Sequence, residues 1–146
     1  MLTMTPWVRK LLIANIVMFF VSRAIPPLYV ALSFYPSHIL DRPWTLVSYM
    51  FLHAGFMHLL FNMIGLYFFG PRVEDRLGVK GFLWLYFLSG LGAALFHFLL
   101  AEGQHPVVGA SGAVYGILLA FAMYWPRVRI YLWAILPIEA WLLATL

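Results

Sequence analysis

The sequence contains no cysteine and few charged residues. Among its 146 residues, charged side chains make up 10% and hydrophobic side chains 64%. The absence of cysteine excludes disulfides, thiolate chemistry and cysteine-ligated metal sites. A water-soluble domain needs far more charge than this to cover its surface. The composition therefore predicts a membrane protein with several spans, and the length predicts a single domain, residues 1–146.

The positive charge is scattered along the chain. Nine Lys and Arg residues outweigh five Asp and Glu residues. The basic residues lie near the ends of predicted helices and form no patch, which argues against a nucleic-acid partner. We expect the protein to bind neither a cofactor nor a metal ion, and we expect the lipid bilayer to be its surroundings.

Apolar runs predict about five membrane-spanning helices, and thus an all-α fold. A helix needs about 20 residues to cross a bilayer. The last run is interrupted by Pro137 and stops at Leu146, so we expect an incomplete span in a truncated part of a longer protein. Residues 28–54 are apolar but contain two prolines and two charges, and are expected to lie in the bilayer interface. The predicted spans are residues 7–21, 56–69, 81–100, 107–125 and 130–146.

The placement of the basic residues favours one orientation in the membrane. Most of them fall on the same side of the predicted spans as the N-terminus, and cytoplasmic loops are enriched in Lys and Arg. We therefore expect a multi-pass protein of the cell (inner) membrane with a cytoplasmic N-terminus. On this topology Arg9, Lys10, Arg72, Arg76, Lys80, Arg127 and Arg129 lie inside, whereas Arg23 and Arg42 lie outside.

Two polar residues stand close together in the second predicted span. His58 and Asn62 are four residues apart, so they share one face of a helix. Such residues can form hydrogen bonds to neighbouring helices, and each bond contributes about 0.6 kcal/mol in membranes. Polar groups inside a membrane are costly unless they are partnered, and they often mark functional sites. Both side chains donate hydrogen bonds, which suits the stabilisation of an oxyanion.

Ser111 lies in the glycine-rich stretch GASGAVYG, residues 109–116. A serine in an apolar helix usually bonds to a backbone carbonyl one turn back. The spacing of Gly112 and Gly116 is typical of closely packed helices and predicts a partner helix, but it does not explain the serine. The stretch differs from the Gly-x-Ser-x-Gly turn of soluble hydrolases, because Ala113 replaces the second glycine.

Three motifs in this order resemble those of the rhomboid family of intramembrane serine proteases. The resemblance extends over nearly the whole chain from Trp7 onward, and it implies a rhomboid-like polytopic helical bundle. The motifs are His53-x4-His58-x3-Asn62, Gly70-x3-Glu74-x3-Gly78 and Gly109-Ala110-Ser111-Gly112.

The resemblance assigns roles to individual residues. It implies that Ser111 is the nucleophile and that His58, Asn62 and the Ser111 N–H stabilise the oxyanion. Five further residues are implied to support the site. Gly109 would keep the approach to the serine open, Gly112 belongs to the serine motif, Tyr115 would pack against the catalytic histidine, His53 would brace the outer loop, and Glu74 would be structural or pair with Arg72 or Arg76.

One part of the family pattern has no counterpart in this chain. Rhomboids use a Ser-His dyad whose histidine comes from a sixth span, and a serine hydroxyl needs an adjacent base to become a nucleophile. His38, His97 and His105 do not match the family position. We therefore expect that the catalytic histidine is missing, that these 146 residues alone are inactive, and that the small residues of the fourth span face the missing helix.

The function implied by the resemblance is cleavage of the transmembrane helices of other membrane proteins near the outer membrane face. An alternative is a non-proteolytic rhomboid-like protein that binds and escorts membrane helices, which would also account for the missing histidine. A small transporter or channel is a third possibility. It would require paired charges or broken helices at the midplane, and Glu139 is the one acidic residue deep in the predicted spans.

Overall fold

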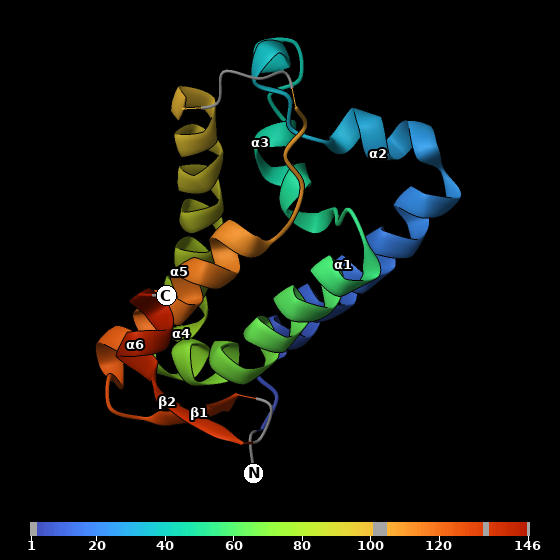
Figure 1. Ribbon diagram of the computed structural model, residues 1–146. Coiled ribbons are helices and arrows are strands. Elements are labelled where there is room, and N and C mark those ends of the chain that lie inside the picture. Colours follow the sequence, from blue (N-terminus) through green and yellow to red (C-terminus); the bar gives the residue numbers. More distant parts are fainter. Residues whose placement is uncertain (1–2, 101–104, 133–134, 146) are drawn as a thin grey trace.

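The computed structural model describes residues 3–100, 105–132 and 135–145, which form a mostly helical protein (Figure 1). Two long helices dominate, and the shorter elements connect or cover them. The helices are α1 (Pro6–Ala24), α2 (Pro26–Leu32), α3 (Thr45–Ser48), α4 (Phe56–Leu100), α5 (Ser111–Tyr124) and α6 (Ala140–Thr145), with 3₁₀ turns η1 (Pro36–His38) and η2 (Tyr49–Phe51) and strands β1 (Arg129–Leu132) and β2 (Leu136–Glu139).

Prolines define both ends of α1. Pro6 occupies the first turn, where its missing N–H has no intrahelical acceptor in any case. Ile25 precedes Pro26 and has a non-helical backbone, as expected for a residue before proline. The helix therefore continues beyond the predicted end at residue 21, because no residue before Ile25 interrupts it.

Helix α4 consists of two arms that meet at Gly78. The glycine has φ +70° and ψ +169°, a conformation that other residues rarely adopt, and it separates a first arm (residues 56–77) from a second arm (residues 79–100). The helix therefore extends beyond residue 69, the predicted end of the second span. The first arm continues through Pro71, and the burial of Val73 and Glu74 holds its last turns against the rest of the protein.

Helix α5 begins at Ser111, four residues later than predicted. Val107 is instead held in an extended bridge to Phe34, with N–O distances of 2.8 and 3.1 Å. Gly109 follows with φ +123°, which a helix cannot accommodate. These two features delay the start of α5 to the serine itself.

The small residues of α5 face the second arm of α4. A Cβ added to Gly112 would clash with Ala93, and one added to Gly116 would clash with Ser89. The expectation that these residues face a missing span is therefore wrong for the described structure. The required partner is the second arm, which the Gly78 joint folds back alongside α5 (Figure 1).

The C-terminal part departs from the all-α prediction. Strands β1 and β2 form an antiparallel hairpin in which Tyr131 pairs with Pro137, and α6 follows. Proline cannot donate to a ladder, and a two-stranded sheet offers it an edge position where no donor is needed. The predicted incomplete span at residues 130–146 is thus replaced by a hairpin and a short helix.

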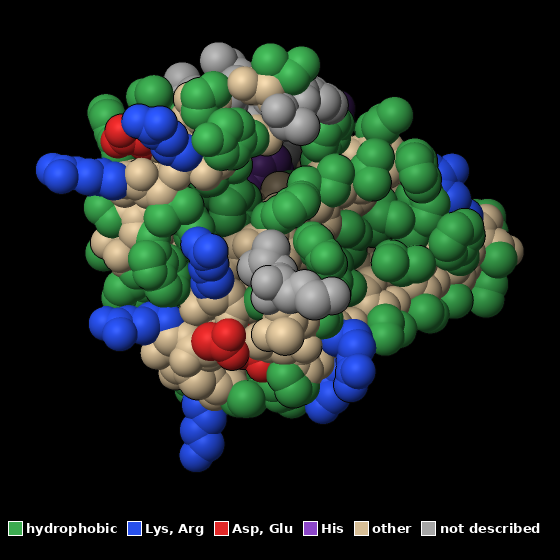
Figure 2. Space-filling view, turned by 90° about the horizontal axis from the view of Figure 1, so that it is seen from below, with side chains coloured by type: hydrophobic (Ala, Val, Ile, Leu, Met, Phe, Trp, Pro, Cys, Tyr) green, Lys and Arg blue, Asp and Glu red, His purple; other side chains and the backbone are tan. Residues whose placement is uncertain are grey.

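Among the described residues, α4 is the helix that is long and apolar enough to cross a membrane. Helix α5 is apolar but shorter, with 14 residues. The count of about five spans remains a prediction. The start of α1, the Gly78 joint and the hairpin lie at one end of the molecule, and Lys and Arg side chains project outward from this end on several sides (Figures 1 and 2).

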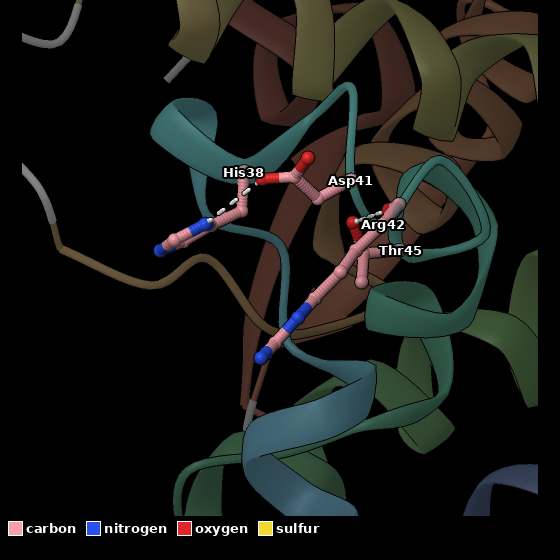
Figure 3. Close-up of polar contacts among 4 residues, drawn as sticks. All are labelled: His38, Asp41, Arg42 and Thr45. Atoms are coloured by element: carbon pink, nitrogen blue, oxygen red, sulfur yellow. Dashed lines mark hydrogen bonds and ion pairs between the residues drawn. The ribbon is translucent and has the colours of Figure 1, made fainter.

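Residues 28–54 are broken into short helical turns, as their prolines and charges predict. In the turn between η1 and α3, His38 Nδ1 lies 3.7 Å from Asp41 Oδ2, and the Thr45 hydroxyl donates to the Arg42 carbonyl oxygen at 2.6 Å (Figure 3). Trp44 also donates to the Ala31 carbonyl at 3.0 Å. The location of this segment in the bilayer interface remains a prediction.

The buried carboxylate of Glu74 joins α4 to the N-terminus of α1. Its oxygens accept hydrogen bonds from the Trp7 and Val8 N–H groups at 3.2 and 3.0 Å, and from the Thr5 hydroxyl. Helix N-termini expose unpaired N–H groups and favour negative charge. Glu74 therefore caps α1, and in the described residues no ion pair joins it to a neighbouring arginine.

Replacing Glu74 with Gln tests this cap. The substitution removes the charge and one of the two acceptor oxygens, so the free energy of unfolding should fall by about 1–2 kcal/mol. Asp75→Asn is the matched control, because Asp75 is the exposed neighbour and should change stability by less than about 0.5 kcal/mol. Denaturation in detergent measures both, and equal effects would contradict the assignment.

Candidate active site

Gly109 and His58 are two predicted site residues that the structure brings into close contact. The Gly109 N–H donates to the Tyr49 carbonyl at 2.9 Å, which fixes the loop before α5. A Cβ added to Gly109 would lie 2.6 Å from both Cε1 and Nε2 of His58. Only glycine combines this φ with so close an approach to the imidazole. His58 therefore lies directly beside the backbone two residues before Ser111.

Ser111 is exposed and forms the first residue of α5. Val114 donates its N–H to Ala110 O at 2.9 Å, which is the first backbone bond of the helix. The N–H groups of the three residues before Val114 have no intrahelical acceptor, because a helix leaves its first donors unpaired. These donors and the positive end of the helix dipole suit an oxygen that gains negative charge.

The first arm of α4 and helix α5 run parallel, so the position of Asn62 relative to α5 follows from the contacts on either side of it. The Gly109–His58 contact is followed by one between Gly65 and Val114, where an added Cβ would lie 2.6 Å from the valine. Asn62 lies between His58 and Gly65 on this face of α4, at the level of the first turn of α5. Its amide donates one hydrogen bond to the His58 carbonyl at 2.8 Å, and a primary amide carries a second donor hydrogen.

Other predicted residues have partners elsewhere. The Tyr115 hydroxyl donates to the Ala144 carbonyl at 2.7 Å, so this side chain contacts α6. Gly112 packs against Ala93 of the second arm. Among the described residues, no hydrogen bond joins the Ser111 hydroxyl to a histidine. His38 lies in the η1 turn beside Asp41, and His97 lines an open groove on the second arm.

His53 lies behind His58 and is 2% exposed. The two rings meet edge to face with centroids 5.1 Å apart. Burial, together with the neighbouring His58, lowers the pKa of His53 to about 4. In the described structure neither ring nitrogen of His53 has a hydrogen-bond partner. His53 is therefore neutral at physiological pH and supports the His58 ring by packing.

Tyr49 is a positioning residue that the sequence pattern did not reveal. Its carbonyl accepts the hydrogen bond from Gly109, and its hydroxyl donates to the Gly90 carbonyl on the second arm at 2.7 Å. One residue thus ties the loop before Ser111 to both the η2 turn and α4. In the sequence, Tyr49 is simply one of several aromatic residues in an apolar loop, which gives no signal for this role.

Replacing Gly109 with Ala should lower the free energy of unfolding by about 2–4 kcal/mol. The change adds the cost of a positive φ to a clash with the His58 ring. Gly92→Ala is the matched control, since a Cβ there meets no atom within 4 Å and should leave stability unchanged or raise it by up to about 1 kcal/mol. If thermal unfolding in detergent showed equal losses, the proposed contact would be wrong.

The pKa of His53 predicts how stability depends on pH. The unfolded chain binds a proton near pH 6.5 and the folded protein near pH 4, so the unfolded state binds more protons between these values. Stability should therefore fall by up to about 3 kcal/mol as the pH drops from 6.5 to 4. His53→Gln should abolish this component, whereas His38→Gln, at an exposed position, should retain it. Denaturation midpoints across this pH range measure the difference, and an unchanged profile in His53→Gln would refute the assignment.

Comparisons with known proteins agree with this arrangement of motifs. A family model described as "Rhomboid domain" matches residues 40–146. "RHOMBOID-like protein 5" of Arabidopsis thaliana is 45% identical over 76 residues, which cover 51% of this chain and 25% of that protein. "RHOMBOID-like protein 12, mitochondrial" of the same plant is 34% identical over 119 residues, covering 70% of this chain and 35% of that protein.

A bacterial relative extends the comparison. "Putative rhomboid protease YdcA" of Bacillus subtilis (strain 168) is 39% identical over 74 residues, covering 51% of this chain and 37% of that protein. The chain thus spans between 25% and 37% of the length of these three relatives. The family model covers most of the chain, including every motif from His53 to Ser111. The chain therefore belongs to the rhomboid family of membrane proteins.

Proposed function

We propose that this chain carries the site of a rhomboid-type intramembrane serine endopeptidase, with Ser111 as the nucleophile. The observation that carries the proposal is the close contact of Gly109 with His58. The His58 ring packs against the backbone two residues before the exposed Ser111, which begins a helix whose first N–H donors are unpaired. Membership of a family that acts on membrane proteins supports the same chemistry.

The proposed reaction proceeds through an acyl-enzyme. The Ser111 oxygen attacks the carbonyl carbon of the scissile peptide bond and passes its proton to a histidine base. The oxyanion is stabilised by the N–H groups of the first turn of α5 and by His58 and Asn62. The same histidine then protonates the leaving amine, and water releases the acyl group by the reverse sequence of proton transfers.

We propose that a histidine outside these 146 residues supplies the base. The exposed positions of Ser111 and Tyr115 at the start of α5 give such a residue access to the nucleophile. The greater length of the curated relatives is consistent with additional segments. A base must come within hydrogen-bond reach of the serine, and the described histidines make no such contact.

The proposed substrates are transmembrane helices of other membrane proteins, cleaved near the outer face of the bilayer. The proposed location is the cell membrane, with several spans and a cytoplasmic N-terminus. The gathering of basic side chains at the end that holds the start of α1 supports this orientation (Figure 2).

Ser111→Ala tests the proposal in the product of the complete reading frame that contains this sequence, assayed in membranes with a reporter transmembrane substrate. The wild type should cleave and Ser111→Ala should not, because the attacking oxygen is lost. Asn62→Ala should lower kcat about a hundredfold by removing one oxyanion donor. Ser37→Ala, in the η1 turn, should retain full activity. The 146-residue chain alone should not cleave.

Two outcomes would overturn the proposal. Cleavage that persists in Ser111→Ala would show that this serine is not the nucleophile. A wild type that binds the reporter helix but never cleaves it would favour the alternative of a non-proteolytic protein that binds and escorts membrane helices.

A further inference from the structure

Two arginines near the Gly78 joint rest on aromatic rings of α5. The Arg72 guanidinium carbon lies 5.9 Å from the centroid of the Phe121 ring, and that of Arg76 lies 5.3 Å from the centroid of the Tyr124 ring. A guanidinium over an aromatic face keeps its charge and can still direct N–H donors outward. The rings therefore hold two cations in place where the end of the first arm of α4 meets the end of α5.

No carboxylate in the described part of the chain neutralises these two arginines. Glu74 lies between them in sequence, but its oxygens are bonded to the N-terminus of α1. Asp75 is exposed, and the one ion pair among the described residues joins His38 to Asp41. Arg72 and Arg76 thus carry positive charge that no ion pair within the described structure compensates.

A hollow beside Arg76 has space for a small anionic group. It is lined by Arg76, Tyr124 and Trp125 and has a volume of about 190 Å³. Arginine donates bidentate hydrogen bonds that match the oxygens of a phosphate. Tyrosine and tryptophan are typical of the depth at which lipid headgroups lie.

Exposed apolar side chains lie near these arginines in both helices. Phe68, one turn before Arg72, is 50% exposed, and Met123, next to Tyr124, is 81% exposed. A free phosphate would leave these side chains uncovered, whereas a phospholipid would place its acyl chains over them. The combination of uncompensated cations and an adjacent apolar surface therefore matches a lipid better than a soluble anion.

We propose that Arg72, Arg76, Tyr124 and Trp125 form a docking surface for the phosphate of an anionic phospholipid. The lipid would lie in the leaflet at the end of the molecule from which Lys and Arg side chains project (Figure 2). Its headgroup phosphate occupies the hollow, and its acyl chains follow the exposed face of α4 and α5. This surface is separate from Ser111, so the proposal does not depend on the proteolytic chemistry.

Lipid binding to the purified chain in detergent tests the proposal. Native mass spectrometry and thermal unfolding would compare phosphatidylglycerol with phosphatidylcholine. The wild type should bind the anionic lipid more tightly and unfold at a higher temperature with it. The double variant Arg72→Gln/Arg76→Gln should bind it about tenfold more weakly. Added salt should reduce the preference, because screening weakens exposed charge interactions.

The control is Arg23→Gln. Arg23 also rests on an aromatic ring, with 4.6 Å between its guanidinium carbon and the centroid of the Phe19 ring, but it lies in the last turn of α1. It should retain the preference for phosphatidylglycerol. Arg76→Lys, which keeps the charge, should retain part of it. Equal loss in Arg23→Gln, or full retention in the double variant, would overturn the proposal. Stabilisation by inorganic phosphate alone, equal to that by the lipid, would also overturn it in favour of a soluble anion.

Discussion

The structure depends on the close approach of the backbone at Gly109 to the imidazole of His58. This contact joins the first arm of α4 to the loop before α5, although the two are far apart in sequence. It exists because residue 109 lacks a side chain and adopts a positive φ, and because the Tyr49 carbonyl holds the loop in place. Ser111 begins α5 two residues later, so this contact fixes the start of that helix relative to the first arm of α4.

The sequence predicts the residues of the candidate site because they follow spacing within helices. His58 and Asn62 share a helical face, and the glycines around Ser111 indicate close packing; the roles that the family motifs imply for them stay predictions. Tyr49 could not be found in this way, since its contribution comes from a backbone carbonyl and a hydroxyl that act on distant segments. Tertiary contacts of this kind leave no local pattern.

The fold was predicted in part. The long apolar runs correctly indicated α1, both arms of α4, and α5. The positions of the ends were wrong where tertiary contacts override local signals: burial of Glu74 carries the first arm past Pro71, and the bridge from Val107 to Phe34 delays α5. The hairpin was missed because an apolar run containing Pro137 looks the same whether it forms a short strand or a broken helix.

The Gly78 joint has a consequence for the geometry around Ser111. Helix α5 contacts the first arm through Val114 and the second arm through Gly112 and Gly116. It therefore packs against α4 on two sides. The angle between the arms sets the distance between them where α5 packs. One residue in the left-handed region, at the opposite end of the first arm from His58, therefore sets how closely the two arms pack against the helix that begins at Ser111.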